Sequence, residues 1–329
     1  MKPTIGISIG DFNGIGPEII LKALEKIDLE KSSPLIIAPK EILDFYAKEL
    51  KLALHVNRCE FLDEIDLDHI NLLDLPTESL NINPGTQSKK SGLIAMQSIE
   101  LGIELASLEV TQALVTAPIS KEAVNLAGYK IPGHTEFLAE KTNTEEVLMM
   151  LVSENFRVAL VTAHIPISKV SETITEDLIL KKLRLLNESL KTDFGIDSPK
   201  IAVFGLNPHA GDGGIIGTEE IDLISPTLQK AIDLGINVEG PFPADGFFGQ
   251  RIDKEFDAIL AMYHDQGLAP FKLLSFGKGV NFTAGLPIIR TSPDHGTAFN
   301  IAGKGTANAS SFIEAYLLAV HLANGRNAD

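Results

Sequence analysis

Cysteine, positive charge and long apolar runs are all scarce in this chain of 329 residues. The single cysteine, Cys59, excludes an intrachain disulfide and fits a reducing compartment. No apolar run is long enough to cross a bilayer, and the N-terminus lacks the pattern of a cleavable signal. The 28 Lys and Arg residues against 44 Asp and Glu give a net charge of −16, which repels nucleic acid and anionic membranes. We therefore expect a soluble cytoplasmic protein that binds neither.

Short apolar runs alternate with segments of helical periodicity along the whole chain. This alternation predicts an α/β fold in which helices cover both faces of a mostly parallel sheet, and the length fits two domains. The helix expected over 88–108 places Met96, Ile99 and Ile103 on one apolar face. The other expected helices begin near Pro17 or span 176–192, 218–234 and 309–323. The expected strands span 4–9, 34–38, 113–118, 146–152, 157–163, 201–206, 257–262, 280–283 and 287–291.

Three histidines, His164, His209 and His264, each follow directly on a short apolar run. Each run is typical of a buried parallel strand, and the carboxyl ends of such strands form the ligand-binding edge of an open α/β sheet. Three imidazoles at that edge could bind one metal ion and leave a coordination position open, as in catalytic zinc sites. The alternative is that each histidine is a hydrogen-bonded structural residue, because sequence spacing alone does not show that they converge.

Two glycine-rich segments are candidates for nucleotide binding. The segment 10–18 joins the first expected strand to the first helix, but its spacing matches neither the dinucleotide fingerprint nor the P-loop. By itself it is better interpreted as a tight structural turn. The segment 292–311 is long and rich in small and amide residues, so we expect more than a connector, with a polar surface loop as the alternative. We expect residues 294–308, faced by 14–16, to bind NAD through Gly296, which permits close backbone approach, and through the side chains of His295, Thr297 and Asn308.

Cations are few in this chain, so their positions are informative. Lys121, Lys272 and Arg290 all lie just beyond strand or turn signals, at the same expected edge as the histidines. His134 and Thr135 open a helix, where an anion could also bind. Each cation taken alone could be a solvated surface charge. Several of them together in an acidic protein would form a local site for an anionic substrate.

Motifs spread over essentially the whole chain carry a resemblance to a known family. They are GDFNGIGPE at 10–18, VTAPISK at 115–121, GHTEFLA at 133–139, NPHAGDGGIIGTEE at 207–220, GPFPADGFF at 240–248, YHDQGLAPFK at 263–272 and VNFTAGLPIIRTSPDHGTAFNIAGKG at 280–305. Together they resemble the 4-hydroxythreonine-4-phosphate dehydrogenase family, and two of them also resemble the cofactor-binding segments of isopropylmalate and isocitrate dehydrogenases. The resemblance implies the two-domain isopropylmalate dehydrogenase-like α/β architecture, without a Rossmann domain. We expect a cofactor domain over 1–130 and 280–329, and a metal, substrate and dimerisation domain over 131–279.

The resemblance also implies a role for each candidate residue. The ligands of one divalent metal ion, zinc or alternatively cobalt or magnesium, would be His164, His209 and His264. The substrate-binding residues would be His134, Thr135, Lys272, Asn281 and Arg290, and the catalytic groups would be Asp245, Asp265 and Lys272. NAD or NADP would bind at Gly14, Ile15, Gly16, His295, Gly296, Thr297 and Asn308. The family's active site lies at a homodimer interface, with metal ligands drawn from both subunits.

The implied reaction is the oxidation of 4-(phosphooxy)-L-threonine at C3 and the decarboxylation of the product, a step of pyridoxal 5′-phosphate biosynthesis. Dehydrogenases of threonate or erythronate 4-phosphate are alternatives with the same fold. A dihydrodiol dehydrogenase is disfavoured by the phosphate-binding residues, and a catalytically silent metal- or phosphate-binding relative is a further alternative. Two departures from the family pattern are visible. Phe12 and Asn13 stand where a proline and a small residue are usual, and Asn300 stands where an acidic residue is common, which leaves the choice between NAD and NADP open.

Overall fold

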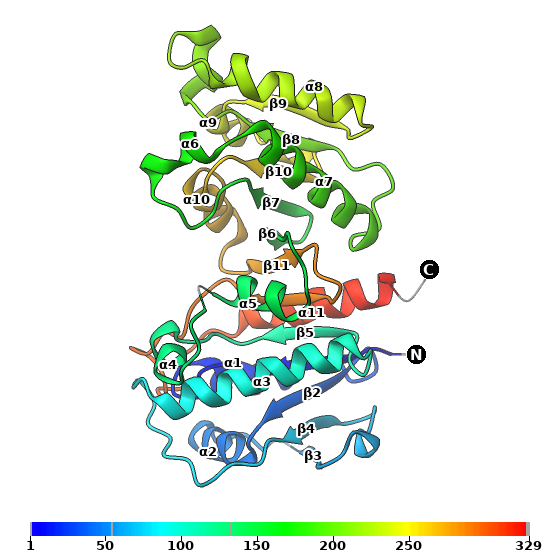
Figure 1. Cartoon of the computed structure of the whole chain (residues 1–329). Helices are drawn as coiled ribbons and strands as arrows, with labels where there is room; N and C mark the ends of the chain where they lie inside the picture. The colour runs from blue at the N-terminus through cyan, green and yellow to red at the C-terminus, as the bar shows by residue number, and fades with distance from the viewer. Residues whose placement is uncertain (1, 54, 132, 327–329) are drawn as a thin grey trace. The chain divides into compact units, whose positions relative to one another are not determined.

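We describe a computed structural model of the chain that defines residues 2–53, 55–131 and 133–326 (Figure 1). It divides into two compact units: unit 1 is Met1–Glu145 with Leu286–Asp329, and unit 2 is Glu146–Gly285. Both boundaries fall later than those expected from the sequence. Helix α5 (His134–Lys141) packs against α3 (Lys89–Ser107) of unit 1, and strand β11 (Val280–Ala284) pairs with β6 (Leu148–Ser153) of unit 2.

Unit 1 contains a parallel sheet with the strand order β3-β4-β2-β1-β5-β12. Its central strands are buried along their whole length, as expected for parallel strands that are covered on both faces. Only small or apolar side chains fit such positions, which explains the short apolar runs in the sequence. The strands are β1 (Thr4–Ser8), β2 (Ser33–Ala38), β3 (Val56–Cys59), β4 (Ile70–Asp74), β5 (Ala113–Thr116) and β12 (Arg290–Pro293).

Two long helices of unit 1 bury the apolar faces that the sequence periodicity predicts. In α3, which lies across the front of the sheet in Figure 1, Met96, Ile99 and Ile103 are buried. In α11 (Ser310–Arg326), Phe312 and Tyr316 are completely buried against the strands. The remaining helices of unit 1 are α1 (Gly16–Leu24), α2 (Lys40–Leu50), α4 (Lys121–Leu126) and α5.

Unit 2 contains a mixed sheet with the strand order β11-β6-β7-β10-β8-β9. The pairs β11–β6 and β6–β7 are antiparallel, and the other pairs are parallel. The strands not yet given are β7 (Phe156–Leu160), β8 (Ile201–Phe204), β9 (Val238–Phe242) and β10 (Ala258–Ala261). The helices are α6 (Val170–Thr173), α7 (Glu176–Thr192), α8 (Ser225–Asp233), α9 (Ala244–Gly249) and α10 (His264–Ser275).

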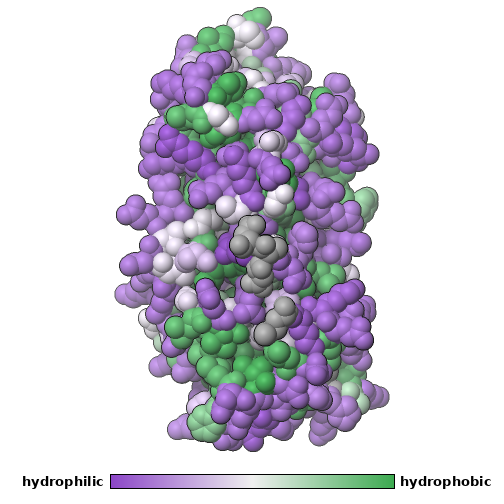
Figure 2. Space-filling view, turned by 90° about the vertical axis from the view of Figure 1, so that its right-hand side faces the viewer, coloured by the Kyte–Doolittle hydropathy of each residue, from purple (hydrophilic) through white to green (hydrophobic). Residues whose placement is uncertain are grey.

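The predicted α/β class with mostly parallel sheets is confirmed. Two elements differ in detail: the strand expected over 287–291 is observed as β12, and the helix expected over 218–234 is a π-helical turn at Glu220–Ile224 followed by α8. Within the described residues, no helix is long and apolar enough to cross a membrane. Hydrophilic residues predominate on the face shown in Figure 2, with smaller apolar patches between them.

Candidate functional site

Strand pairing in unit 2 brings two of the three predicted metal ligands together. His164 follows β7, and His264 follows β10 as the first residue of α10. β7 and β10 are parallel neighbours in which Leu160 pairs with Ala261, so both strands end at the same edge of the sheet. The imidazole rings of the two histidines accordingly lie 5.8 Å apart between centroids.

The neighbouring carboxylate engages one ring nitrogen of His264 and leaves the other without this contact. The Nδ1–H of His264 donates to Oδ1 of Asp265 at 2.7 Å, which leaves Nε2 available as a ligand atom. Metal-binding histidines commonly use one ring nitrogen for the metal and donate the other N–H to a carboxylate, which orients the ring. The pair His164 and His264 with Asp265 therefore fits a borderline divalent cation such as zinc or cobalt.

The third histidine lies in the loop that follows β8. His209 lines a cavity of about 360 Å³ together with Asp245, which is on α9. Tyr263, the residue before His264, lines the same cavity. Phe247 anchors α9 because its ring is buried among other phenylalanines, and this anchoring places Asp245 at the cavity.

The structure thus assembles the predicted metal-binding and acidic residues of unit 2 in two groups. One group is His164, His264 and Asp265, and the other is His209 with Asp245. Among the residues that the structure describes, no three His, Cys, Asp or Glu side chains of this chain form a ready metal-binding group. That the three histidines bind one ion stays a prediction.

Unit 1 contains a buried cation near the start of α5. Arg290, on β12, is 1% exposed, and its Nε and Nη2 donate to Oγ1 of Thr116 on the neighbouring strand β5, at 3.0 and 2.7 Å. Burial lowers the pKa of Arg290 to about 10, and Glu136 opposes that effect. The guanidinium therefore stays charged at neutral pH although it is almost completely enclosed, and such a group suits an anionic ligand.

His134, at the start of α5, lies close enough to Arg290 for the two groups to interact electrostatically. Burial, followed by the positive charges of Arg290 and Lys121, holds the pKa of His134 well below its usual value, so the ring is neutral at pH 7. Its Nε2 is buried without a hydrogen-bond partner among the described residues. Since a buried polar atom is normally paired, Nε2 is available to a bound ligand. Thr135 is the next residue of the same helix.

The other two predicted substrate-binding residues belong to unit 2. Lys272 is an exposed residue of α10, and it already interacts with another group of the protein. Asn281 is on β11 opposite Leu151, and its Oδ1 is buried without a hydrogen-bond partner in the described part of the chain.

The two glycine-rich segments contact each other in unit 1, as expected from the sequence. The backbone N–H of Ile15 donates to the carbonyl of Thr297 at 3.0 Å. A Cβ on Gly14 would lie 2.9 Å from that same carbonyl, so this position requires glycine. Gly296 has open space around it, and Nε2 of His295 is buried without a partner among the described residues. Asn308 uses its Oδ1 to accept the N–H of Ser310 at the start of α11.

Sequence reasoning missed a third segment of this loop cluster. The backbone N–H groups of Asn83 and Gly85 donate to Oδ1 and to the carbonyl of Asn13, at 2.9 and 2.8 Å. The Pro84-Gly85 dipeptide is a turn signal that could have identified it.

Two residues of α1 also hold the second glycine-rich segment. Oε1 of Glu18 accepts the N–H of Ala307 at 2.8 Å, and Nζ of Lys22 donates to the carbonyls of Gly305 and Ala307 at 2.9 and 2.8 Å. The loop that precedes Asn308 is therefore fixed to α1, which suits a preformed ligand site.

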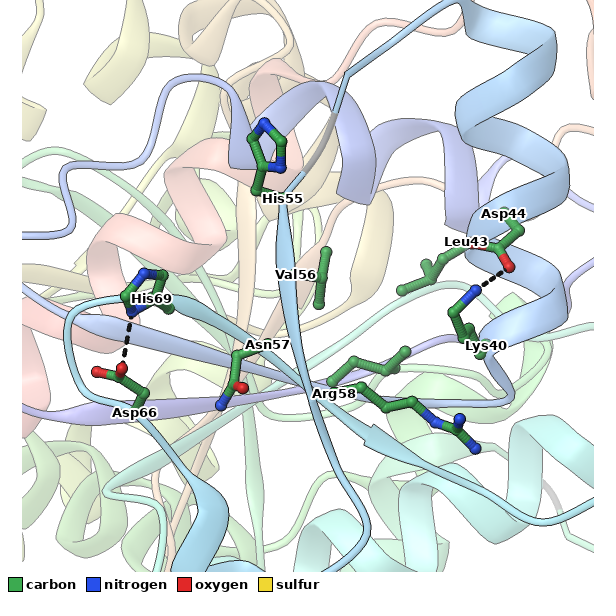
Figure 3. Close-up of a pocket in the computed structure, with 10 residues that line it drawn as sticks. Lys40, Leu43, Asp44, His55, Val56, Asn57, Arg58, Asp66 and His69 are labelled. Carbon is green, nitrogen blue, oxygen red and sulfur yellow. Dashed lines mark hydrogen bonds and ion pairs between the residues drawn. The ribbon is translucent and has the colours of Figure 1, made fainter.

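A larger pocket of about 490 Å³ lies elsewhere in unit 1, between α2 and the strands β3 and β4 (Figure 3). None of the predicted site residues lines it. Several of its charged residues are already paired: Lys40 with Asp44, His69 with Asp66 at 2.9 Å, and Arg58 with Asp74, which lies outside the lining, at 2.7 Å. Because this pocket contains none of the predicted site residues, we do not assign a function to it.

Comparison with known proteins gives matches over the whole chain. Residues 30–319 match the family model described as "Pyridoxal phosphate biosynthetic protein PdxA". The 4-hydroxythreonine-4-phosphate dehydrogenase of Bacteroides thetaiotaomicron is 41% identical over 330 residues, which cover 100% of this chain and 91% of the relative. An Oceanobacillus iheyensis protein provisionally assigned as a D-threonate 4-phosphate dehydrogenase is 44% identical, with 98% of both chains covered. The crystal structure of 4-hydroxythreonine-4-phosphate dehydrogenase from Klebsiella pneumoniae superposes with a TM-score of 0.89 at 37% identity, with 98% of both chains covered.

Proposed function

The chain belongs to the family of the pyridoxal phosphate biosynthetic protein PdxA, and we propose that it is an NAD(P)- and metal-dependent dehydrogenase of 4-(phosphooxy)-L-threonine. The reaction oxidises C3 to a β-keto acid, which loses CO₂ to give 3-amino-2-oxopropyl phosphate. The observation that supports this proposal best is the buried pair of Arg290 and neutral His134 in unit 1, which suits a phosphate group; within the described residues, Nε2 of His134 is buried without a hydrogen-bond partner.

Arg290 and His134 suit a phosphate because the two groups are complementary. Arg290 is held in place by Thr116 and supplies a full charge from a desolvated position, where a hydrogen bond to an anion is strong. His134 adds a donor without adding a second buried charge. We assign Thr135, Lys272 and Asn281 to the same substrate, whose remote phosphate would orient C3 for reaction.

Oxidation at C3 removes a hydride from the carbon and a proton from the hydroxyl group: bound NAD(P)⁺ would accept the hydride, and a base of the protein would take the proton. A divalent cation held by His164, His209 and His264, zinc or alternatively cobalt or magnesium, supplies Lewis acidity to the hydroxyl oxygen when it is bound. We assign the proton to Asp245, whose exposed carboxylate lines the same cavity as His209. Asp265 orients the ring of His264. We assign Lys272 as the third catalytic residue, beside Asp245 and Asp265.

We assign the cofactor to the loop cluster of unit 1, at Gly14, Ile15, Gly16 and residues 295–297, with Asn308 as a further contact. The unpartnered Nε2 of His295 and the open space at Gly296 support this assignment. We further propose that the active enzyme is a homodimer in which the partner subunit completes the metal site.

A second candidate is a dehydrogenase of D-threonate or D-erythronate 4-phosphate, which the 44% identity with the Oceanobacillus protein favours. The substrates differ at C2, where the threonine derivative has an ammonium group and the sugar acids have a hydroxyl. All three share the terminal phosphate and the C3 hydroxyl, so contacts of Arg290 and His134 with the phosphate cannot distinguish them.

The deciding experiment is NADH or NADPH formation by the purified protein with each of the three substrates. It is run before and after treatment with a chelator, and again after zinc, cobalt or magnesium is restored. We expect the highest kcat/KM with 4-(phosphooxy)-L-threonine and no turnover without metal. A higher kcat/KM with a sugar-acid phosphate selects the second candidate, and full activity after chelation contradicts the metal assignment.

A further inference from the structure

The loop that presents His209 has an unusual backbone. Every residue from His209 to Gly214 has a positive φ, with values between 46° and 96°. His209, Ala210 and Asp212 have side chains, and each such residue costs about 1–2 kcal/mol in the left-handed region. A turn of this kind needs support from the surrounding structure to persist.

Glu220 provides that support from the π-helical turn before α8. Its Oε1 accepts the backbone N–H groups of Leu206 and Asn207, both at 2.7 Å. Its Oε2 accepts Nδ2 of Asn207 at 2.9 Å. One carboxylate thus binds the chain at three points directly before His209, and hydrogen bonds to an ionised carboxylate are about twice as strong as neutral ones.

The loop is also packed tightly around this carboxylate. A Cβ on Gly205 would lie 2.9 Å from Oε1, and a Cβ on Gly211 would lie 2.7 Å from Oε2. Glu220 is 3% exposed, and the hydrogen-bond partners described for its carboxylate are N–H groups of the loop. Its buried charge is therefore stabilised by hydrogen bonds from the loop. Burying a charge costs free energy, so we infer that this contact does more than hold the fold together.

A second side chain connects the same loop to the segment of His264. Nε2 of Gln266 donates to the carbonyl of Gly205 at 2.7 Å, and its Oε1 accepts the N–H of Met262 at 2.8 Å. Gly205 is the residue before the N–H groups that Glu220 holds. The chain segments of His209 and His264 are therefore joined by a continuous set of hydrogen bonds.

We propose that Glu220 is a positioning residue that fixes the left-handed turn so that the His209 imidazole is preorganised for a divalent cation. This inference rests on the proposed function of His209 as a metal ligand. Glu220 does not touch the cation or the substrate. It acts through Asn207 and the backbone of the loop.

The test measures Co²⁺ binding to the full-length protein by titration calorimetry and by visible absorption, with the Glu220→Gln variant. Glutamine keeps the size of the side chain but places an NH₂ group against one of the three donors and removes the charge. We expect Co²⁺ to bind about 10–100-fold more weakly, with an altered absorption spectrum, as is typical when an outer-shell partner is lost. A purely structural role would lower the thermal midpoint without changing the Co²⁺ affinity of the folded protein.

The adjacent Glu219 provides a matched control. Its Oε2 accepts the same Nδ2 of Asn207 at 2.7 Å, but it is half-buried and receives neither backbone N–H group of the loop. The Glu219→Gln variant should keep its Co²⁺ affinity within about twofold of the parent, the usual range for a surface substitution. If Glu220→Gln does not fold, Asn207→Ala tests the same inference: it removes the side-chain contacts to Glu220 and Glu219, keeps both backbone N–H donors and should also weaken Co²⁺ binding, and the Glu219→Gln control separates the two contacts.

His209→Ala distinguishes the two levels of the proposal. If this variant keeps the parent's affinity, or if the parent does not bind Co²⁺, the metal site and the role of Glu220 are both wrong. If His209→Ala loses the ion while Glu220→Gln and Asn207→Ala keep it, only the positioning role is overturned.

Discussion

The buried carboxyl of Asp11 should make stability depend on pH in a direction opposite to that of most carboxylates. Asp11 is completely buried in the loop after β1, where Oδ1 accepts the N–H of Asn13 at 3.0 Å and Oδ2 accepts the hydroxyl of Ser91 at 3.1 Å. Burial raises the pKa of Asp11 from 3.8 to about 6, against the lowering effect of those two hydrogen bonds. The folded protein therefore holds a proton that the unfolded chain has released over this range of pH.

The sign follows from proton linkage. Between the two pKa values the native state binds more protons than the unfolded state, so the free energy of unfolding falls as the pH rises. At 1.36 kcal/mol per pKa unit, ionisation of Asp11 costs the wild type about 1 kcal/mol at pH 4.5 and about 3 kcal/mol at pH 7.5. Asn at this position does not ionise, so Asp11→Asn should gain about 2 kcal/mol over the wild type between these two pH values.

The assay is urea unfolding of both proteins at pH 4.5 and 7.5. The quantity compared is the difference in the free energy of unfolding between variant and wild type at each pH. Asp28→Asn is the matched control. Oδ1 of Asp28 accepts the N–H of Glu30 at 3.0 Å in the same i to i+2 arrangement, but Asp28 is exposed. For Asp28→Asn, the difference from the wild type in the free energy of unfolding should change by less than about 0.5 kcal/mol between pH 4.5 and 7.5. An Asp11→Asn difference that is equal at both pH values would refute the reasoning.

Three further predictions concern the proposed sites. His264→Ala should lose bound metal and turnover while the protein keeps its thermal midpoint without metal; metal analysis after dialysis checks this, and retained metal would contradict the assignment. Arg290→Ala should lower kcat/KM for a phosphorylated substrate about 100-fold, as loss of a charge-assisted contact does. In the Arg290→Ala variant, the shift in thermal midpoint that NAD produces should stay as it is in the wild type. If the variant changes only the affinity for NAD, Arg290 belongs to the cofactor site instead. Gly296→Val should fold, because a Cβ has room there, yet lose the NAD-dependent shift, whereas Gly14→Ala should destabilise the loops themselves.

The long elements could be predicted because their apolar periodicity is strong and their burial is complete. In α3, the residues Met96 and Ile99 recur at helical spacing and are fully buried. The run 201–206 predicts a strand, and β8 is buried throughout. For such segments, local pattern and tertiary packing agree.

Several elements could not be predicted because packing, rather than pattern, determines them. The strand β9 contains Gly240 and Pro241, and half-exposed β3 contains Asn57 and Arg58, so neither shows a clear apolar run. The helix α10 includes Pro270, which usually ends a helix. Tertiary contacts override these local preferences.

The site could be predicted at the level of residue types and strand ends, but not at the level of loop geometry. Parallel strands explain why His164 and His264 are close, and that argument needs only the sequence. The left-handed turn at His209 could not be anticipated, because it includes Ala210, which rarely adopts positive φ, and because a run of such residues is rare even though Asp and His tolerate positive φ. The residue that stabilises it, Glu220, lies in a segment that the sequence indicates only as part of a helix.

Buried charges explain why these loops are geometrically defined. Arg290, Asp11, Glu18 and Glu220 are all nearly inaccessible: Arg290 is on β12, Asp11 is in the loop after β1, Glu18 is on α1 and Glu220 is in the π-helical turn before α8. Their partners are hydroxyl groups and backbone N–H groups of the loops, with Lys22 as the ion-pair partner of Glu18. A buried charge is tolerated only when such partners are held in fixed positions, so the cost of burial favours one loop conformation over the alternatives. In this protein, the buried charges therefore fix the loop conformations that position the candidate ligand-binding side chains.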